Sequence, residues 1–398
     1  MSLVLKNCRA VITPISSQLV RVMENVSINI HKGTIVNIGS SISKSQTAID
    51  CSEFIVLPGF VDCHIHIASS IIGSKAFKAE CDEVSNLITF YEEKLSNEKS
   101  YHAAKILSLK SLISGTTVAS IYGLPNTYIN RLEKETGLRL FSGSLVRGKR
   151  HFPSQQYLDK SSIFFTYLKD DYEDAIQRLK ELLRKGLRIA IHLPLSGAEI
   201  LRFRSKYGYF PIEFLNKFDI LRSNISLLHV DWITSWEIQL LSRANVGVVI
   251  SPISTAIYAC RGFSPINELI KYGISVGLGT DLGLACGLNI IDSFKLLFML
   301  YRHSYGDLRV GIELAFYTAT AGGYKVLGLK GGIIKPGYLA DLVLVKANYL
   351  DIEDLPYSLL NLKDHSIEVV IVNGRIAYYK DQKEHILKII KNERKYLK

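Results

Sequence analysis

The chain has 398 residues, of which 47% are hydrophobic and 21% are charged, and its formal net charge is +11. This length and apolar content allow one large core and a smaller one, as in a single α/β barrel with an added domain. The basic residues form no long block, and those near the C-terminus surround apolar residues in a pattern typical of a surface helix. No stretch approaches the ~18 uninterrupted apolar residues of a membrane span. We therefore expect neither nucleic acid nor a membrane as a partner.

The six cysteines are scattered, and no two of them form a Cys-x-x-Cys pair. The first residues show no basic region followed by an apolar stretch, so a secretory signal is not expected. Both observations favour free thiols in a reducing cytoplasm. The cysteines are Cys8, Cys51, Cys63, Cys81, Cys260 and Cys286.

In chain order, residues 3–57 have the pattern of short strands, and residues 342–345 and 369–372 are similar runs near the other end. Asn373-Gly374 after the last run is a favoured hairpin pair. Between these ends, helix-period segments alternate with short apolar runs, which predicts parallel βαβ units. The runs end near His66, Ile121, Gly143, His192, His229, Ile250 and Asp281, and residues 163–167 are our choice for the fourth strand.

The economical arrangement of these units is an α/β fold with an eight-stranded (β/α)8 TIM barrel. We expect the barrel over residues 58–331. A small β-sandwich domain would then be assembled from residues 1–57 and 332–398. Active sites of such barrels lie at the carboxyl ends of the strands.

The stretch Pro58-Gly59-Phe60-Val61-Asp62-Cys63-His64-Ile65-His66 follows an apolar run and carries two histidines two residues apart. On a strand, this spacing places both imidazoles on one face, which suits neighbouring positions on a metal ion. Taken alone, the pattern also fits a strand whose polar face meets water.

Three further metal-competent residues end short apolar runs: His192, His229 and Asp281. In a barrel, these ends meet the end of the first strand at one rim. Three histidines and a carboxylate suit a borderline divalent cation such as zinc or iron. Each residue alone has an ordinary alternative, a hydrogen-bonded core histidine for His192 or His229 and a helix N-cap for Asp281.

With these motifs the chain resembles the amidohydrolase superfamily, in the branch of cytosine, guanine and S-adenosylhomocysteine deaminases and chlorohydrolases. The resemblance also includes Lys335-Pro336-Gly337-Tyr338-Leu339-Ala340-Asp341 and extends over nearly the whole chain. It implies a metal-dependent hydrolase in which His64, His66, His192 and Asp281 bind the metal and His229 lies beside it. No lysine matches the bridging lysine of the two-metal branches, so we expect one divalent ion, zinc first and iron as the alternative.

This site implies a mechanism in which the cation activates a water molecule. Asp281 would accept the proton of that water and later deliver it to the leaving group. His229 would stabilise the oxyanion or orient the attacking oxygen. We therefore regard Asp281 and His229 as the catalytic residues.

The chain departs from the deaminase pattern at three positions. The glutamate that protonates the ring nitrogen in the related deaminases is replaced by Leu195. The second histidine of the strand-six motif is replaced by Trp232, and the histidine of the strand-seven motif is replaced by Ile250. Losing a general acid costs about 10²–10⁴-fold in rate. These changes favour a hydrolase that needs no ring protonation.

The predicted function is metal-dependent hydrolysis of a carbon–nitrogen bond other than a peptide bond, or a related bond, in a small molecule. One alternative is a deaminase of a nucleobase-like heterocycle with a substitute acid, either Asp231 or, as a weaker candidate, Glu199. The other alternative is a degenerate barrel that binds a metal or ligand without catalysis. Asp231, Trp232 and Arg147 are the candidate substrate-binding residues, and a homodimer is left open.

Overall fold

The computed structural model describes residues 2–40, 47–145, 162–168, 173–308, 310–354 and 356–397. Eight parallel strands follow one another around a barrel in sequence order. A parallel bridge between Ile65 and Asp281 joins the last segment to the first strand. The strands are β6 (Phe60–His66), β7 (Thr116–Tyr122), β8 (Arg139–Leu145), β9 (Ser162–Tyr167), β10 (Arg188–His192), β11 (Ile225–Leu228), β12 (Gly247–Ile250) and β13 (Val276–Leu278). The expected barrel, including its fourth strand, is confirmed.

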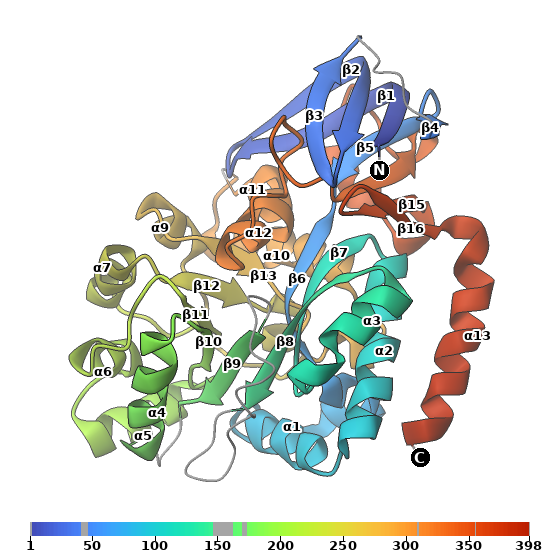
Figure 1. Ribbon diagram of the computed structural model, residues 1–398. Helices are drawn as coiled ribbons and strands as arrows, with labels where there is room; N and C mark the ends of the chain where they lie inside the picture. The colour runs from blue at the N-terminus through green and yellow to red at the C-terminus, as the bar shows by residue number, and fades with distance from the viewer. Residues whose placement is uncertain are drawn as a thin grey trace.

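Helices cover the outside of the barrel, as the amphipathic segments between strands require (Figure 1). The described helices are α1 (Val84–Glu93), α2 (Asn97–Ile113), α3 (Ile129–Thr136), α4 (Glu173–Arg184), α5 (Gly197–Tyr207), α6 (Pro211–Lys217), α7 (Ser235–Ala244), α8 (Pro252–Ile257), α9 (Ile266–Lys271), α10 (Ile290–Tyr305), α11 (Ile312–Tyr317), α12 (Gly323–Val326) and the C-terminal α13 (Lys383–Glu393). None of the described helices is both long and apolar enough to cross a membrane.

A second sheet is built from both ends of the chain and lies at one end of the barrel (Figure 1). Its strands are β1 (Ser2–Ser16), β2 (Leu19–His31), β3 (Thr34–Gly39), β4 (Thr47–Asp50), β5 (Phe54–Pro58), β14 (Leu342–Lys346), β15 (Ile367–Val372) and β16 (Arg375–Tyr379). Their order is β16-β15-β14-β5-β1-β2-β3, with β4 paired to β1. The predicted α/β class with a small β domain from both termini is thus confirmed, while its boundaries at residues 58 and 332 stay a prediction.

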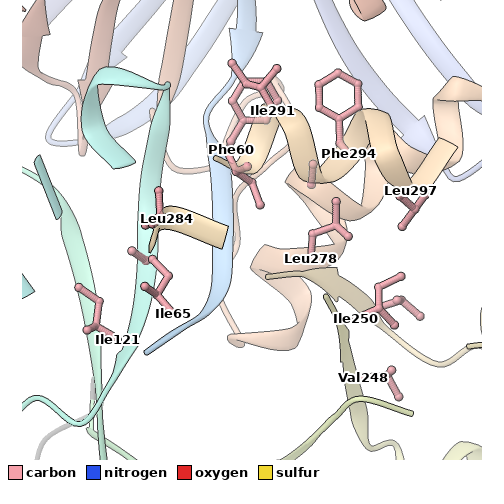
Figure 2. Close-up of a cluster of buried hydrophobic side chains, with 14 of the residues drawn as sticks. Phe60, Ile65, Ile121, Val248, Ile250, Leu278, Leu284, Ile291, Phe294 and Leu297 are labelled. Carbon is pink, nitrogen blue, oxygen red and sulfur yellow. The ribbon is translucent and has the colours of Figure 1, made fainter. Parts of the chain in front are cut away.

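The apolar layer between strands and helices explains the near-continuous hydrophobic runs of the strands. Figure 2 shows part of it, where Phe60 of β6 lies beside Phe294 of α10 with ring centroids 6.1 Å apart. Ile65 belongs to this same outer layer, whereas Val61 and Cys63 pack inside the barrel. Residues on both faces are buried, as expected for a parallel sheet covered by helices.

The joint between the barrel and the terminal sheet is centred on Asp341, whose side chain is fully buried. Its carboxylate accepts hydrogen bonds from the Tyr324 hydroxyl at 2.8 Å and from the backbone N–H of Asn373 at 2.6 Å. Arg139 of β8 contacts both carboxylate oxygens at 3.3 Å. The backbone carbonyl of Asp341 accepts from Gly59 N–H, directly before β6. One aspartate therefore connects the first and third barrel strands to the terminal sheet.

The C-terminal helix α13 packs against α2 beside the barrel (Figure 1). Lys105 of α2 lies 2.8 Å from Glu135 of α3 and 2.9 Å from Glu393 of α13, so a single ammonium group bridges two helices. Burial raises the pKa of Glu135, but hydrogen bonds from Lys105, Tyr101 and Arg131 outweigh burial and lower it from 4.5 to about 2. Tyr101 and Lys105 therefore favour the charged form of this carboxyl group.

We expect this network to make stability depend on pH in the acid range. Because the folded-state pKa of Glu135 is depressed, its stabilisation is complete above about pH 4.5 and is lost as pH falls towards about 2. The amount is within about 1 kcal/mol, because the site is largely exposed. Urea unfolding should show wild type more stable than Glu135→Gln near neutral pH, with the difference shrinking as the medium is acidified. A difference that is the same at both ends of this range would contradict the assignment.

The expectation that all six cysteines are free thiols is wrong. Cys81 and Cys260 form a disulfide, with Cα atoms 5.5 Å apart and a sequence separation of 179 residues. The fold brings the segment before α1 and the segment after α8 together over the barrel rim, which spacing in the sequence cannot reveal. The remaining four cysteines are free. The argument from cysteines for a reducing compartment is therefore lost.

Candidate active site

The two histidines of β6 turn their Nε2 atoms towards each other, 3.0 Å apart. The Nδ1 atom of His64 lies 3.3 Å from the Ser251 hydroxyl, and the Nδ1 atom of His66 lies 2.8 Å from a Glu92 carboxylate oxygen. Partners at Nδ1 fix the orientation of each ring and leave Nε2 to face a common point. Both side chains are fully buried.

An irregularity in β6 gives these histidines their direction. The register between β6 and β7 shifts between Asp62 and Ile65. Without the shift, His64 and His66 would share the face opposite to Val61 and Cys63, which fill the barrel interior. Such bulges often redirect side chains beside active sites. The buried Asp62 carboxylate holds the distorted segment by accepting from His64 N–H and from the Thr280 hydroxyl.

His192, His229 and Asp281 gather around the same point. Asp281 Oδ1 lies 3.8 Å from His64 Nε2 and 3.7 Å from His66 Nε2, and Asp281 Oδ2 lies 3.6 Å from His229 Nε2. One ring nitrogen of His192 lies within 4.8 Å of those of His64 and His66. The structure thus brings together all five residues that the sequence placed at the barrel rim.

The backbone at two of these residues is unusual. His229 has φ +60° and Asp281 has φ +53°, both in the left-handed region that non-glycine residues seldom adopt. The Asp281 N–H donates to the His64 carbonyl at 2.7 Å, and the His229 N–H donates to the Val249 carbonyl at 3.2 Å. Hydrogen bonds to neighbouring strands therefore hold both residues in a conformation that points their side chains at the site.

The donor set fits a divalent cation. In the described part of the chain, no hydrogen-bond donor serves the buried Asp281 Oδ1 atom, an arrangement that is costly for a carboxylate unless a positive charge lies beside it. Burial, together with the three neighbouring imidazoles, holds the pKa of His64 well below its ordinary value. A neutral imidazole is the form that binds a metal. Imidazole and carboxylate ligands suit zinc and similar ions.

A small cavity of about 20 Å³ opens beside this cluster. Its polar wall contains His192, His229, Asp281 and Glu199. Its other lining residues come from α1, from the end of β9 and the residue after it, and from the segment after β10; they are Val84, Ser85, Ile88, Tyr167, Leu168, Leu193, Pro194 and Leu195. The space holds about one water molecule, so a larger ligand requires these walls to move apart.

The three candidate substrate-binding residues fall in different places. Asp231 lines a separate cavity of about 280 Å³, where the Thr255 hydroxyl donates to its carboxylate. Trp232 donates from Nε1 to the Leu195 carbonyl at 3.2 Å and lies outside the lining of the small cavity. Arg147 lies outside the described residues. Substrate contacts for all three stay a prediction.

Two residues that the sequence interpretation missed are Glu92 and Ser251. Ser251 follows β12 directly, so its place at the rim was a usable signal. Glu92 lies on α1, in a connection whose path over the site cannot be read from sequence spacing.

Comparison with known proteins agrees with this architecture. A family model described as the amidohydrolase family matches residues 55–377. The chain belongs to the amidohydrolase family. The predicted class, a metal-dependent hydrolase acting on carbon–nitrogen bonds other than peptide bonds, is confirmed.

Among curated relatives of this amidohydrolase is a 5-methylthioadenosine/S-adenosylhomocysteine deaminase from Thermococcus onnurineus. It is 29% identical over 375 residues, which cover 87% of this chain and 88% of the relative. A 5'-deoxyadenosine deaminase from Methanosarcina barkeri is 27% identical over 89% of this chain and 88% of its own length.

Solved structures share the fold. A zinc-bound adenosine deaminase from Xanthomonas campestris superposes with a TM-score of 0.85 at 17% identity, covering 99% of this chain and 98% of that chain. A guanine deaminase from C. acetobutylicum with bound guanine gives a TM-score of 0.80 at 21% identity, covering 95% and 100%.

Proposed function

We propose that this amidohydrolase removes an exocyclic amino group from a small aromatic heterocycle, releasing ammonia, with one zinc ion held by His64, His66, His192 and Asp281. The observation that carries the proposal is the cavity that joins this ligand cluster to a second carboxylate, Glu199. The names of the relatives, which are deaminases of adenosine-like compounds, support the same class of substrate.

The residues around the cluster have separate tasks in this reaction. A divalent cation bound here would lower the pKa of a coordinated water towards about 7. Asp281 accepts the water proton and carries it to the departing nitrogen, since its Oδ1 atom faces the histidine ligands and its Oδ2 atom faces His229. His229 Nε2 stabilises the charge that develops on the attacking oxygen. The apolar residues that line the cavity exclude bulk water from the reacting atoms.

A second candidate reaction is hydrolysis that needs no protonated ring, such as opening of a cyclic amide. The observation in its favour is Leu195, which lines the cavity and has no proton to give. It requires the same metal and the same Asp281, so the two candidates differ in the substrate and in the need for a proton donor to the ring.

Two measurements test the proposed function. Metal analysis of the purified protein should find about one zinc per chain, and His64→Ala should reduce it sharply. Ammonia release should then be measured with adenosine, 5'-deoxyadenosine, 5'-methylthioadenosine, adenine and guanine, alongside hydrolysis of cyclic amides. A protein that is purified without metal and fails to rebind zinc would contradict the proposal. Turnover of cyclic amides without ammonia release would support the second candidate reaction instead.

Glu92 gives a separate prediction about the metal. Burial lowers the pKa of the His66 imidazole, but the Glu92 carboxylate outweighs burial and raises it, which reflects the 2.8 Å contact at Nδ1. Because partners of ligand histidines orient the ring, Glu92→Ala should weaken zinc binding by about 10–100-fold. Competition with a chelator measures this, and Glu93→Ala, on the adjacent exposed position of the same helix, is the control. Equal zinc affinity in the two variants would remove Glu92 from the metal site.

A further inference from the structure

We propose that Glu199 is the general acid that protonates the ring nitrogen of the substrate, in the place that the related deaminases give to the residue corresponding to Leu195. The inference rests on the proposed deaminase function and adds the residue that the reaction otherwise lacks. Deamination of an aromatic ring requires a proton on the ring nitrogen as water adds to the adjacent carbon. Leu195 cannot supply it.

The local structure of α5 brings the Glu199 carboxylate to this position. Glu199 is the third residue of the helix, and with Ser196 it forms a capping box. Its Oε2 atom accepts from Leu195 N–H at 2.8 Å and from Ser196 N–H at 3.4 Å. The side chain therefore folds back towards the helix start, and its carboxylate lies against the backbone of Leu195. A carboxylate anchored there stands close to where a glutamate at position 195 would begin.

Glu199 also borders the space next to the proposed metal ligands. It lines the same cavity as His192, His229 and Asp281. The loop that carries it is fixed from outside by Trp232, which donates to the Leu195 carbonyl and packs over Gly197, where a Cβ atom would lie 3.2 Å from the indole. Trp232 is thus a positioning residue for the segment that presents Glu199.

Asp231, the other candidate acid, is engaged elsewhere. One of its carboxylate oxygens accepts from the Ser264 hydroxyl and the other from the Thr255 hydroxyl at 3.2 Å. It lines the larger cavity, whereas His229, two residues before it, faces the metal ligands. The left-handed turn at His229 separates the two side chains. Among the described residues, Glu199 is therefore the carboxyl group outside the ligand cluster that lines the small cavity.

The proton balance closes with two carboxyl groups. The reaction requires Glu199 to carry a proton at the start and Asp281 to be ionised. Water adds through oxygen to the amino-bearing ring carbon, one water proton passes to Asp281, and the Glu199 proton passes to the ring nitrogen. Asp281 then protonates the amino group, which leaves as ammonia with the electron pair of the carbon–nitrogen bond. The hydroxyl proton on the ring carbon returns to Glu199 as the carbon–oxygen double bond forms, so both carboxyl groups regain their starting states.

The test is Glu199→Gln, because glutamine preserves the capping box and cannot donate an acid proton. With the compound of the panel that the wild type deaminates fastest, kcat of the variant should fall by about 10²–10⁴-fold, while zinc content and melting temperature stay at wild-type values. Glu213→Gln is the matched control, because Glu213 is the third residue of α6 and its carboxylate accepts from Phe210 N–H in the same way, outside the active site. It should retain wild-type kcat.

Restoring an acid at position 195 gives a readout that a purely structural role would not produce. The double variant Leu195→Glu with Glu199→Gln should have a kcat at least about tenfold higher than that of Glu199→Gln alone, since its new carboxyl group replaces the missing donor. If kcat is unchanged in Glu199→Gln, or falls only in proportion to a loss of bound zinc, the role of Glu199 is wrong while the proposed function stands. If wild-type protein loaded with zinc releases ammonia from none of the five heterocycles, the proposed function fails, and the role of Glu199 fails with it.

Discussion

Replacing Asp281 by asparagine should reduce turnover by roughly 10²–10⁴-fold, which is the contribution of a positioned proton carrier. The amide can still offer an oxygen to the cation, but it cannot accept the proton of the attacking water. Asparagine also tolerates the left-handed backbone at this position, where φ is +53°. The loss should therefore appear in kcat while the melting temperature is maintained.

The measurement compares ammonia release and zinc content in wild type, Asp281→Asn and Glu384→Gln. Glu384 is an exposed carboxylate on α13, so its conversion to an amide is a control remote from the site. If Asp281→Asn retains wild-type kcat with zinc bound, another group carries the proton and the mechanism above is wrong.

The second large effect concerns stability. Asp341→Ala should lower the free energy of unfolding by about 3–5 kcal/mol, the usual cost of leaving a buried charge without its partner. The change removes acceptors for Arg139, for the Tyr324 hydroxyl and for Asn373 N–H together. Because Asp341 joins the barrel to the terminal sheet, we also expect the two parts to unfold less cooperatively.

Urea unfolding monitored by circular dichroism and by tryptophan fluorescence measures both effects. Tyr324→Phe is the comparison, because it removes one hydrogen bond to the same carboxylate, together with the 3.0 Å contact to the Thr117 hydroxyl, and should cost about 1–2 kcal/mol. Equal losses in the two variants would show that Asp341 contributes no more than this single contact.

Much of the fold was predictable because burial on both faces leaves a clear sequence pattern. Strands such as β10 and β11 are short apolar runs ending in or before a histidine, and parallel strands must end at the same rim. That rule alone places His192 and His229 near His64. The prediction failed where proximity depends on long connections, as with the pair Cys81 and Cys260.

The periodicity of apolar residues in the sequence could not predict the finer features of the site. Strict alternation along β6 predicts that His64 and His66 share a face, which is right, but it does not predict the bulge that turns this face inward. The contact of Glu92 with His66 depends on how α1 crosses the rim. The replacement of the deaminase glutamate by Leu195 stays a prediction, while the return of the Glu199 side chain towards Leu195 follows from helix capping rather than from motif spacing.

The left-handed backbone at His229 and Asp281 limits how stable this enzyme can become. Each such residue costs on the order of 1–3 kcal/mol relative to an ordinary conformation. Selection for activity therefore keeps conformational strain at the ends of two barrel strands, and variants such as His229→Gly should melt at a higher temperature while losing activity. Efforts to make a thermostable catalyst from this scaffold have to draw on other positions, for example Ala259 and Lys32, which share the left-handed backbone but lie outside the ligand cluster.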